Sequence, residues 1–462
     1  MIARSARLIT IISLLLFAAV AGHAAIPMFP PANTVWVSAG GNLRAAKNAV
    51  TCNATTRTCI MVGPGRYYTN DLWKACLDWF YWPGATVSFT SDGNGDDAGI
   101  YDDRTSATPG TNTVAGYGSF EWHGGPEVNA DYVSGAFVVS NSLSVVTLSG
   151  NSILCEEGGA LQGARQGALL GLAGRMIANF GRIFDPNNAI SYTAGVYWEG
   201  GEMDVTCPVI DMDNGYGVWA KEIATNTSAN LWVKGYQIQC RSGVGLQIDT
   251  QAVSTNNAFR VWVDANELAG ATGVVIVNGH TNFNRGTRSY VRCDKLDGTV
   301  SVNSGTLWIN ALGKWAARAG QFLNMNGGRL FATSPQYEDL QGSSVGVRRF
   351  DIQNGVSFFN GGWVRTADGM GFWIRGGTNR LVNMLVDTSA GSQSTNIPLT
   401  LQANGTILQN CTMIAPAGST NFVHAALAQN LKIYGTVQSN KNTNNLVSIL
   451  SGTLQVDADV TE

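Results

Sequence analysis

The acidic side chains between residues 204 and 295 are the groups in this sequence best suited to acid–base chemistry. Cleavage of a polysaccharide uses a pair of carboxylates, or a base acting beside a calcium ion that acidifies a sugar carbon. The candidate catalytic residues are four aspartates and one histidine: Asp211, Asp213, Asp249, Asp264 and His280. The alternative is that these residues are solvated charges on turns, with His280 a turn residue inside its Asn-Gly-His-Thr stretch.

A second group of oxygen-bearing side chains has the spacing of a calcium-binding loop. Asp92, Asn94 and Asp96 occupy positions 1, 3 and 5 of such a loop, and Asp103 falls at position 12. Position 6 is Asp97, where the sharp turn of an EF-hand needs glycine, and no flanking helices are indicated. If this segment binds a metal, we expect Ca²⁺; the alternative is an exposed acidic loop, and no other cofactor is indicated.

Tryptophan is the third residue type that points to a ligand, because aromatic faces stack on sugar rings. The chain has 13 tryptophans, several of which recur along its repeats from residue 198 onward. We take four of them as candidate carbohydrate-binding residues: Trp198, Trp219, Trp232 and Trp262. The alternative is that they fill a hydrophobic core.

The elements that would position these side chains are short β-strands. After residue 76 the chain alternates runs of β-branched and aromatic residues with Gly, Asn, Ser or Thr, and related phrases return every 20–30 residues or so. Residues 156–185 depart from this rhythm, with glycines four apart; we interpret them as glycine-rich coil with short strands, rather than a packed membrane helix. The pattern predicts a solenoid, in which residues one coil apart become neighbours, so that several of the candidate aspartates would line one face.

Composition favours parallel coils over other β architectures. Charged residues make up 13% of the chain, glycine numbers 55 and the formal net charge is −3. In a parallel solenoid, similar residues of successive coils lie directly above one another and form columns. Charged side chains in such a column would repel one another, whereas amides and hydroxyls can hydrogen-bond along it. Glycine suits tight corners because it accepts positive φ. The same low charge argues against a nucleic-acid partner, whose phosphates need clustered lysine and arginine.

The N-terminus indicates the compartment. Residues 1–24 have a positive start, an apolar stretch and a small-residue cleavage site, which is typical of a secretory signal peptide; a signal anchor is the alternative. No later segment is long and apolar enough to cross a membrane. We therefore predict a protein that is secreted, periplasmic or on the cell surface, with residues 25–76 as an N-terminal cap and first strand and residues 77–462 as the solenoid.

Export permits disulfides. A polar turn separates Cys52 from Cys59 and predicts a disulfide between them. Cys240, Cys293 and Cys411 each occupy an inward position of an alternating strand, so we interpret them as small buried hydrophobic residues, with pairing as the alternative.

Residues 42–50, a short amphipathic segment, and residues 59–68, a strand containing Pro-Gly-Arg-Tyr, resemble the N-terminal cap of the pectin-lyase-like right-handed β-helix superfamily. Residues 404–413 resemble one of its coils. The resemblance implies an all-β, right-handed parallel β-helix with a short N-terminal capping helix. It is weaker for activity, since Trp262-Val263-Asp264 matches part of a pectate lyase phrase but Ala265 replaces its histidine.

Two functions are consistent with these observations. The first is a lyase or hydrolase acting on an extracellular, acidic polysaccharide. The second is a non-catalytic adhesin, structural element or module that binds a cell-surface glycan. Export and aromatic content favour the first, whereas the missing catalytic motifs favour the second.

Overall fold

The structure, a computed structural model, describes most of the 462-residue chain. The described residues are 33–53, 55–70, 72–90, 98–102, 111–123, 133–157, 165–186, 193–221, 229–249, 259–279, 288–317, 320–339, 348–366, 370–391, 397–402, 405–417, 423–439, 447–457 and 460–461. The proposed signal peptide and His280 lie outside these ranges, as do the four residues of the proposed calcium loop, Asp92, Asn94, Asp96 and Asp103.

The chain divides into two compact units, which are described separately. Unit 1 comprises residues 1–184 and 204–208, and unit 2 comprises residues 185–203 and 209–462. Strand β14 (Glu202–Thr206) has residues in both. The remaining elements of unit 1 are β1 (Thr34–Val37), α2 (Leu43–Ala49), β2 (Thr58–Val62), β3 (Gly65–Thr69), β4 (Leu77–Tyr81), β5 (Ala85–Thr90), β6 (Ala98–Asp102), β7 (Thr111–Gly116), β8 (Ser119–His123), β9 (Val133–Val139), β10 (Val145–Glu157), β11 (Arg165–Gly171) and β12 (Arg175–Phe184).

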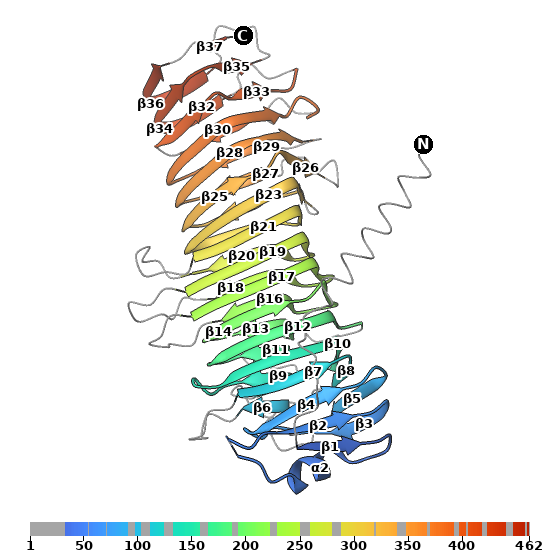
Figure 1. The fold of residues 1–462 in the computed structure, drawn as a ribbon. Helices are drawn as coiled ribbons and strands as arrows, with labels where there is room; N and C mark the ends of the chain where they lie inside the picture. The colour runs from blue at the N-terminus through green and yellow to red at the C-terminus, as the bar shows by residue number, and fades with distance from the viewer. Residues whose placement is uncertain are drawn as a thin grey trace, which may run out of the picture. The chain divides into compact units, whose positions relative to one another are not determined.

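Unit 2 consists of strands throughout its described part (Figure 1). They are β13 (Ala194–Trp198), β15 (Val209–Met212), β16 (Tyr216–Lys221), β17 (Ala229–Cys240), β18 (Val244–Asp249), β19 (Phe259–Gly270), β20 (Gly273–Asn278), β21 (Arg288–Asp297), β22 (Val300–Ser304), β23 (Thr306–Ala317), β24 (Leu323–Met325), β25 (Arg329–Thr333), β26 (Gln336–Asp339), β27 (Arg348–Ile352), β28 (Val356–Arg365), β29 (Met370–Ile374), β30 (Thr378–Asp387), β31 (Leu399–Leu401), β32 (Thr406–Gln409), β33 (Thr412–Ile414), β34 (Val423–Tyr434), β35 (Val437–Ser439), β36 (Val447–Asp457) and β37 (Val460–Thr461).

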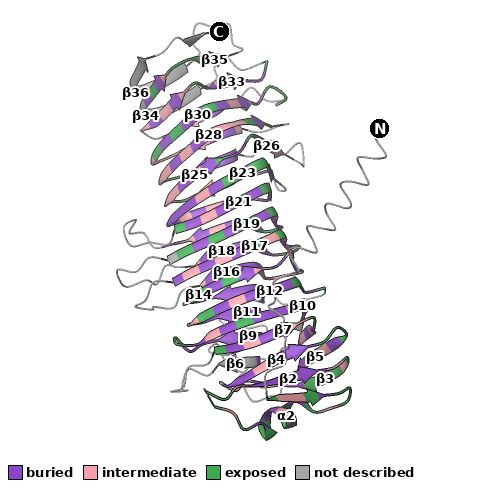
Figure 2. Cartoon of the chain, in the orientation of Figure 1, coloured by how far each residue is buried: buried purple, intermediate pink, exposed green. Residues whose placement is uncertain are grey.

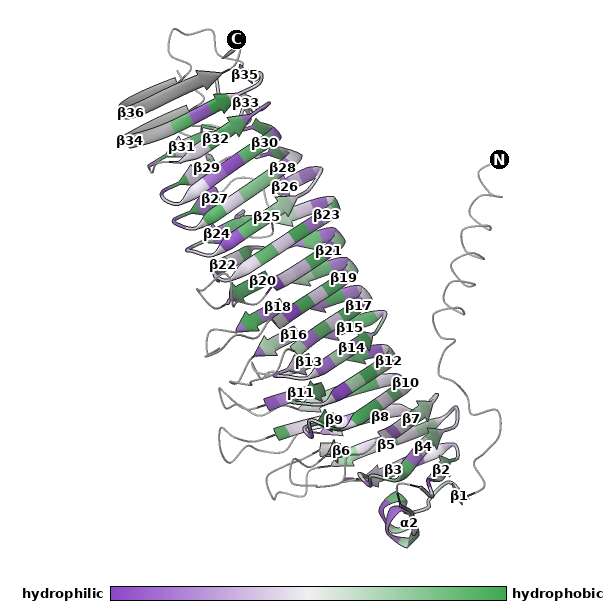
Figure 3. Ribbon diagram, turned by 60° about the vertical axis from the view of Figure 1, so that its left-hand side comes forward, coloured by the Kyte–Doolittle hydropathy of each residue, from purple (hydrophilic) through white to green (hydrophobic). Residues whose placement is uncertain are grey.

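Each unit is a parallel solenoid, which confirms the predicted all-β fold class. In unit 2, β17 pairs in parallel with β19, β19 with β21 and β21 with β23, while β16 pairs with β18 and β18 with β20. Figure 3 shows the second series stacked strand upon strand. In unit 1, β3 pairs with β5 and β5 with β8 in the same way. Each strand therefore lies beside the equivalent strand of the next coil.

Inward columns of apolar residues form the core. One column of unit 2 runs through successive strands in register, and every member is buried: Val233, Val263, Val291, Ile309, Ala332, Phe359 and Leu381. Figure 2 shows the resulting alternation of buried and less buried residues along the strands. Because side chains alternate between the two faces of a strand, the neighbouring positions must point outward.

Glycine occupies successive corners of unit 2, as the composition predicted. Gly355 has φ +102° and Gly377 has φ +80°, which other residues rarely adopt. A Cβ atom on Gly377 would lie 1.9 Å from the carbonyl oxygen of Gly355, one coil earlier. Stacked backbone at the corner thus requires glycine for space as well as for conformation.

The short helix of unit 1 is where the cap was predicted. Helix α2 begins after Asn42, whose side-chain oxygen accepts a hydrogen bond from the Ala45 backbone N–H at 2.8 Å and so caps the helix. Of the apolar side expected from the sequence (Leu43, Ala46 and Val50), Leu43 and Val50 are buried and Ala46 is partly exposed, while Lys47 is buried as well. Residues 165–171 and 175–184 are strands β11 and β12, which excludes a membrane helix for this segment. Across the described part of the chain, no helix has the length and hydrophobicity needed to cross a membrane.

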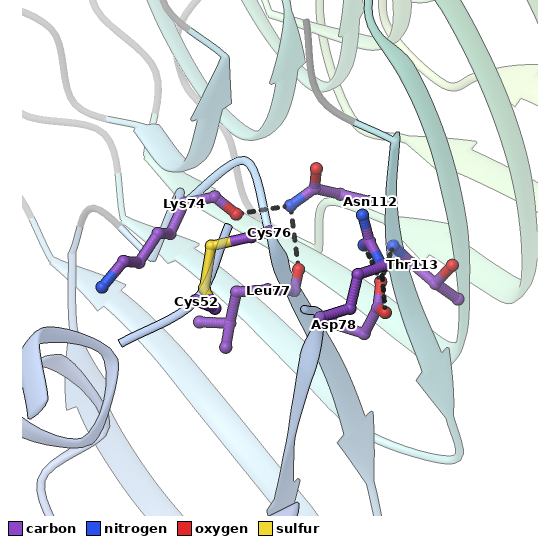
Figure 4. Close-up of polar contacts among 8 residues, drawn as sticks. Cys52, Lys74, Cys76, Leu77, Asp78, Asn112 and Thr113 are labelled. Carbon is purple, nitrogen blue, oxygen red and sulfur yellow. Dashed lines mark hydrogen bonds and ion pairs between the residues drawn. A yellow bond between two sulfur atoms is a disulfide. The ribbon is translucent and has the colours of Figure 1, made fainter. Parts of the chain in front are cut away.

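The predicted disulfide between Cys52 and Cys59 is wrong. Cys52 pairs with Cys76, 24 residues away, and Figure 4 shows this bond beside the start of β4. The prediction assumed that the polar turn after Cys52 folds back on itself. Instead the turn leads into β2, which contains Cys59 and pairs with β4 of the next coil. Cys76, just before β4, therefore lies beside Cys52. Cys59 instead points into the core, where burial and then the nearby charge of Asp78 raise the pKa of its thiol to about 11.

The cysteines interpreted as buried hydrophobic residues are free and buried. Burial raises the pKa of the Cys240 and Cys293 thiols to about 12 in each case, and it also raises the pKa of Cys411. These thiols therefore stay neutral and act as small core side chains.

Candidate functional site

The candidate aspartates do not line one face. Asp211 is in register with Gln239, Asp249 with Lys221 and Asn278, and Asp264 with Lys234 and Arg292. These are three separate columns of unit 2. The expectation of a shared face is therefore wrong. Each coil contributes several strands that lie on different faces of the solenoid, and the aspartates come from different strands of their coils.

Asp211 and Asp213 form an ion-pair network. The Arg241 guanidinium donates two hydrogen bonds to the Asp211 carboxylate, each of 2.9 Å, and lies 3.8 Å from Asp213. Gln239 donates a further hydrogen bond of 2.7 Å to Asp211. The hydrogen bond to Asp211 is the main reason why the pKa of Arg241 is raised. A carboxylate held by a bidentate arginine is suited to joining coils rather than to exchanging protons.

Asp249 and Trp219 are two predicted residues that the structure brings into direct contact. The Trp219 indole N–H donates to Asp249 at 2.9 Å, and Gln247 and Asn278 donate to the other carboxylate oxygen at 2.8 and 2.6 Å. Lys221, in register with Asp249, lies 5.2 Å from the Trp219 ring centre. Three donors thus engage both carboxylate oxygens of Asp249, an arrangement suited to joining neighbouring coils.

An asparagine ladder extends from Asp249 along successive coils. Asn278 donates to Asp249, Asn303 donates to Asn278 at 2.7 Å and Asn326 donates to Asn303 at 2.7 Å. This arrangement confirms the predicted hydrogen bonding of stacked amides. It also explains how a column can carry polar residues without charge repulsion.

The stacked strands β17, β19, β21, β23, β25 and β28 of unit 2 carry an outward aromatic column. It is defined here as six residues in mutual register: Trp232, Trp262, Tyr290, Trp308, Phe331 and Phe358. The ring centres of Tyr290 and Trp308 are 4.7 Å apart, and those of Trp308 and Phe331 are 5.3 Å apart, both pairs stacked face to face. The middle rings therefore cover one another's faces and present their edges to solvent.

Trp262 differs from the rings that follow it. Its plane makes an angle of 88° with that of Tyr290, and 45% of its surface is exposed. It can therefore offer a ring face to a ligand. Trp198 and Trp219 are buried in the core and offer none, while Trp232 is partly exposed beside Trp262.

Basic side chains flank the aromatic column. Each lies two residues before or after a member of the column along the same strand. This basic strip consists of Lys234, Arg260, Arg288, Arg292 and Arg329. Among the flanking positions of β17, β19, β21, β23 and β25, the only carboxylate is Asp264, which lies 3.7 Å from Arg292 in an exposed pair. The strip is therefore locally positive in a chain whose formal net charge is −3.

Most residues of the column and the strip were not among the sequence-based candidates. An arginine or lysine two positions from an aromatic residue recurs in β17, β19, β21 and β25. That spacing places both side chains on one face of a strand, and it was the signal available in the sequence.

No metal centre appears within the residues that the structure describes, since no group of three or more His, Cys, Asp or Glu side chains there is arranged to hold a metal ion. Comparison with known proteins gives no matching family model, no matching curated protein and no matching solved structure.

Proposed function

We propose that this protein is a secreted or surface-exposed β-helix that binds an acidic extracellular polysaccharide along the aromatic column and basic strip of unit 2. The observation that carries the proposal is the grouping of four arginines and a lysine around the aromatic column, in which Trp262 is exposed, with a single carboxylate among them.

The chemistry of the strip matches an anionic sugar polymer. Guanidinium groups form paired hydrogen bonds with carboxylates, and Arg260 and Arg288 are both exposed on adjacent coils. The Trp262 face provides an apolar surface beside them. Because the coils repeat at about 4.8 Å, the strip presents these contacts along a line, as a polymer requires.

Export and family membership belong to the same proposal. The signal-like residues 1–24 support a secreted or cell-surface location, where acidic polysaccharides occur. The resemblance of the cap to the pectin-lyase-like β-helix superfamily, and the parallel solenoid itself, support a glycan ligand. A binding role for unit 2 is compatible with either a non-catalytic module or an enzyme.

Affinity electrophoresis tests the proposal. The full chain is run through gels containing polygalacturonate, alginate or a neutral glucan, with and without added salt. We expect retardation by the acidic polymers only. Trp262→Ala and Arg260→Ala/Arg288→Ala should each weaken binding about tenfold or more, which corresponds to about 1.4 kcal/mol.

A matched control is Trp363→Ala. Trp363 is 38% exposed on β28 but lies outside the aromatic column, so its removal should leave binding unchanged. Equal retardation by the neutral glucan, or wild-type affinity in the Trp262 and arginine variants, would refute the proposal. Preferential binding to a DNA fragment of the same charge density would refute the choice of ligand.

A further inference from the structure

The disulfide of unit 1 lies where three elements of the N-terminal cap meet (Figure 4). Cys52 follows the C-terminal end of helix α2, and Cys76 is the last residue of a short stretch before β4, called here the cap segment (residues 72–76). Strand β7 lies beside β4 in the next coil. Cys76 is 5% exposed and Cys52 is partly exposed. Because this is the one disulfide in the described part of the chain, a reductant acts there at a single, defined place.

Polar contacts join α2 to the chain around the cap segment. The ammonium group of Lys74 donates hydrogen bonds to the backbone carbonyl oxygens of Val50 and Lys47. Carbonyls at the end of a helix lack donors within the helix, so the lysine satisfies groups that would otherwise need water. Near the start of α2, Arg44 donates a hydrogen bond of 3.2 Å to the side chain of Asn70. The helix is therefore held at both of its ends.

Asn112 on β7 fixes the cap segment to the next coil. Its side-chain amide donates two hydrogen bonds of 2.8 Å, to the backbone carbonyl oxygens of Lys74 and Leu77, which flank the disulfide. Asn112 is 4% exposed, so these bonds are shielded from water. Next to it, the backbone N–H of Thr113 donates to the Asp78 carboxylate at 2.8 Å. The cap segment thus lies between α2 and β7 and contacts both.

These contacts are weak without the covalent bond. Helix α2 has 7 residues, whereas isolated helices shorter than about 12–15 residues are marginal in water. Besides the buried Leu43 and Val50, it is held by hydrogen bonds near the surface, and each of these contributes little against competition from water. The disulfide closes a loop between residues 24 apart and so removes most of the open conformations of the cap segment.

We propose that the Cys52–Cys76 disulfide is a redox-sensitive latch of the N-terminal cap. In the oxidised protein it holds α2 and the cap segment against β7. On reduction, α2 and the cap segment open together, while the strands around them stay folded. Those strands are held by their own parallel pairing, β2 with β4, β3 with β5 and β4 with β7. The latch belongs to unit 1 alone and goes beyond the function proposed for unit 2.

A dithiol reductant supplies the electrons for this switch. Its thiolate attacks Sγ of Cys52, the more exposed of the two cysteines, and the sulfur–sulfur bond breaks. Cys76 leaves as a thiolate and takes up a proton. The second thiol of the reductant then attacks the mixed disulfide, which releases Cys52 as a thiol and closes a disulfide within the reductant. Two electrons and two protons pass to the protein.

Hydrogen exchange followed by mass spectrometry tests the latch on the full chain, oxidised and after reduction with dithiothreitol. We expect the exchange of the α2 and cap-segment amides to rise about 10²-fold on reduction, because closing a loop of this size shifts the opening equilibrium by about that factor. Peptides from β17, β19 and β21 of unit 2 should exchange at the same rate in both states.

Alkylation by iodoacetamide gives a second readout. Once the cap opens, the Cys76 thiol should be labelled rapidly, whereas Cys59, which is 3% exposed on β2, should stay unlabelled. Cys52→Ser produces the unlatched protein without a reductant. This variant keeps the test valid if dithiothreitol does not reach the bond.

Asn112→Ala tests whether the disulfide and β7 hold the same segment. In the oxidised protein the loss of its two hydrogen bonds should raise exchange in the cap segment about tenfold. In the reduced protein the effect should be less than about twofold, because the segment is already released. Asn303→Ala is the matched control: it removes a hydrogen bond of 2.7 Å between coils of unit 2 and should leave the cap segment unchanged in both states. Asn112→Ser serves if the alanine variant does not fold.

The outcomes are decisive for the latch. Equal exchange of α2 in the oxidised, reduced and Cys52→Ser proteins overturns it. A comparable rise in the unit 2 peptides also overturns it, because the disulfide would then stabilise the chain as a whole. An Asn112→Ala effect of the same size in both redox states overturns the shared hold on the cap segment. Retardation in acidic gels is measured separately, so failure of the latch and failure of the proposed function are distinguishable.

Discussion

The asparagine ladder makes a specific prediction about charge within a column. Asn278 donates a hydrogen bond of 2.6 Å to Asp249, and the two residues are in register on adjacent strands. Asn278→Asp keeps the shape of the side chain but replaces the donor by a carboxylate oxygen. The substitution therefore converts a hydrogen bond into a repulsive contact between two like charges.

The magnitude follows from the strand spacing. Two unit charges about 4.8 Å apart repel by about 0.9 kcal/mol in water and by about 3.5 kcal/mol at an effective dielectric constant of about 20. The lost hydrogen bond to a charged acceptor costs about 1.5–3 kcal/mol. Asp249 is partly exposed, so solvent screening reduces the repulsion, and we expect a total loss of about 2–4 kcal/mol.

Urea unfolding at neutral and acidic pH measures this loss. The expected penalty is present at neutral pH and shrinks on acidification, because protonation of either carboxylate removes the repulsion and restores a donor. Asn310→Asp is the matched control: Asn310 is exposed and in register with Arg292, so its replacement should change the free energy of unfolding by less than about 0.5 kcal/mol. An Asn278→Asp protein as stable as wild type, or a penalty independent of pH, would refute the reasoning.

Three further predictions concern side chains that join or fill the coils. Cys76→Ser opens the 24-residue loop closed by Cys52 and should cost about 3–4 kcal/mol, a difference from wild type that vanishes when both are unfolded in reductant. Burial raises the pKa of Cys240 from 9.0 to about 12, so the unfolded chain loses this proton first and stability falls as pH rises from 9.0. In that range the free energy of unfolding of the wild type should fall with pH more steeply than that of Cys240→Ala. The difference in slope should be about 1.4 kcal/mol per pH unit, as followed by denaturant unfolding. Arg241→Ala removes the bidentate partner of Asp211 and should destabilise by about 1–3 kcal/mol, whereas adding Asp211→Asn should recover part of this loss, as measured by the same method.

Fold class was accessible from the sequence because it depends on local pattern. Alternation within strands, glycine at corners and asparagine in place of charge are each visible in short stretches of the chain. The ladder from Asn278 to Asn326 and the corner at Gly377 are the physical features that those patterns predict. The capping helix was equally local, since Asn42 and the apolar positions after it lie within nine residues.

The disulfide and the candidate site depend on register, which a single sequence does not specify when coil lengths vary. Trp232 and Trp262 are 30 residues apart, but Tyr290 and Trp308, their counterparts on later coils, are only 18 apart. With such variation, the column to which a given aspartate belongs cannot be counted out along the chain. The disulfide partner of Cys52 could not be counted out either, because Cys76 lies one coil later and its position depends on the length of that coil.

Charged residues make up only 13% of the chain, which by itself suggests that few positions remain for an acid–base site. The structure weakens that inference, because stacking brings together residues that are remote in sequence. Ser88 and His123 are 35 residues apart, and Arg66 and Glu121 are 55 apart, yet each pair is in contact. An active site in a solenoid is therefore limited by how many charged residues lie in adjacent columns. The total number of charged residues in the chain matters less. A polymer lying along the coils would meet such columns in sequence, so scattered charges in the sequence are compatible with a dense site on the surface.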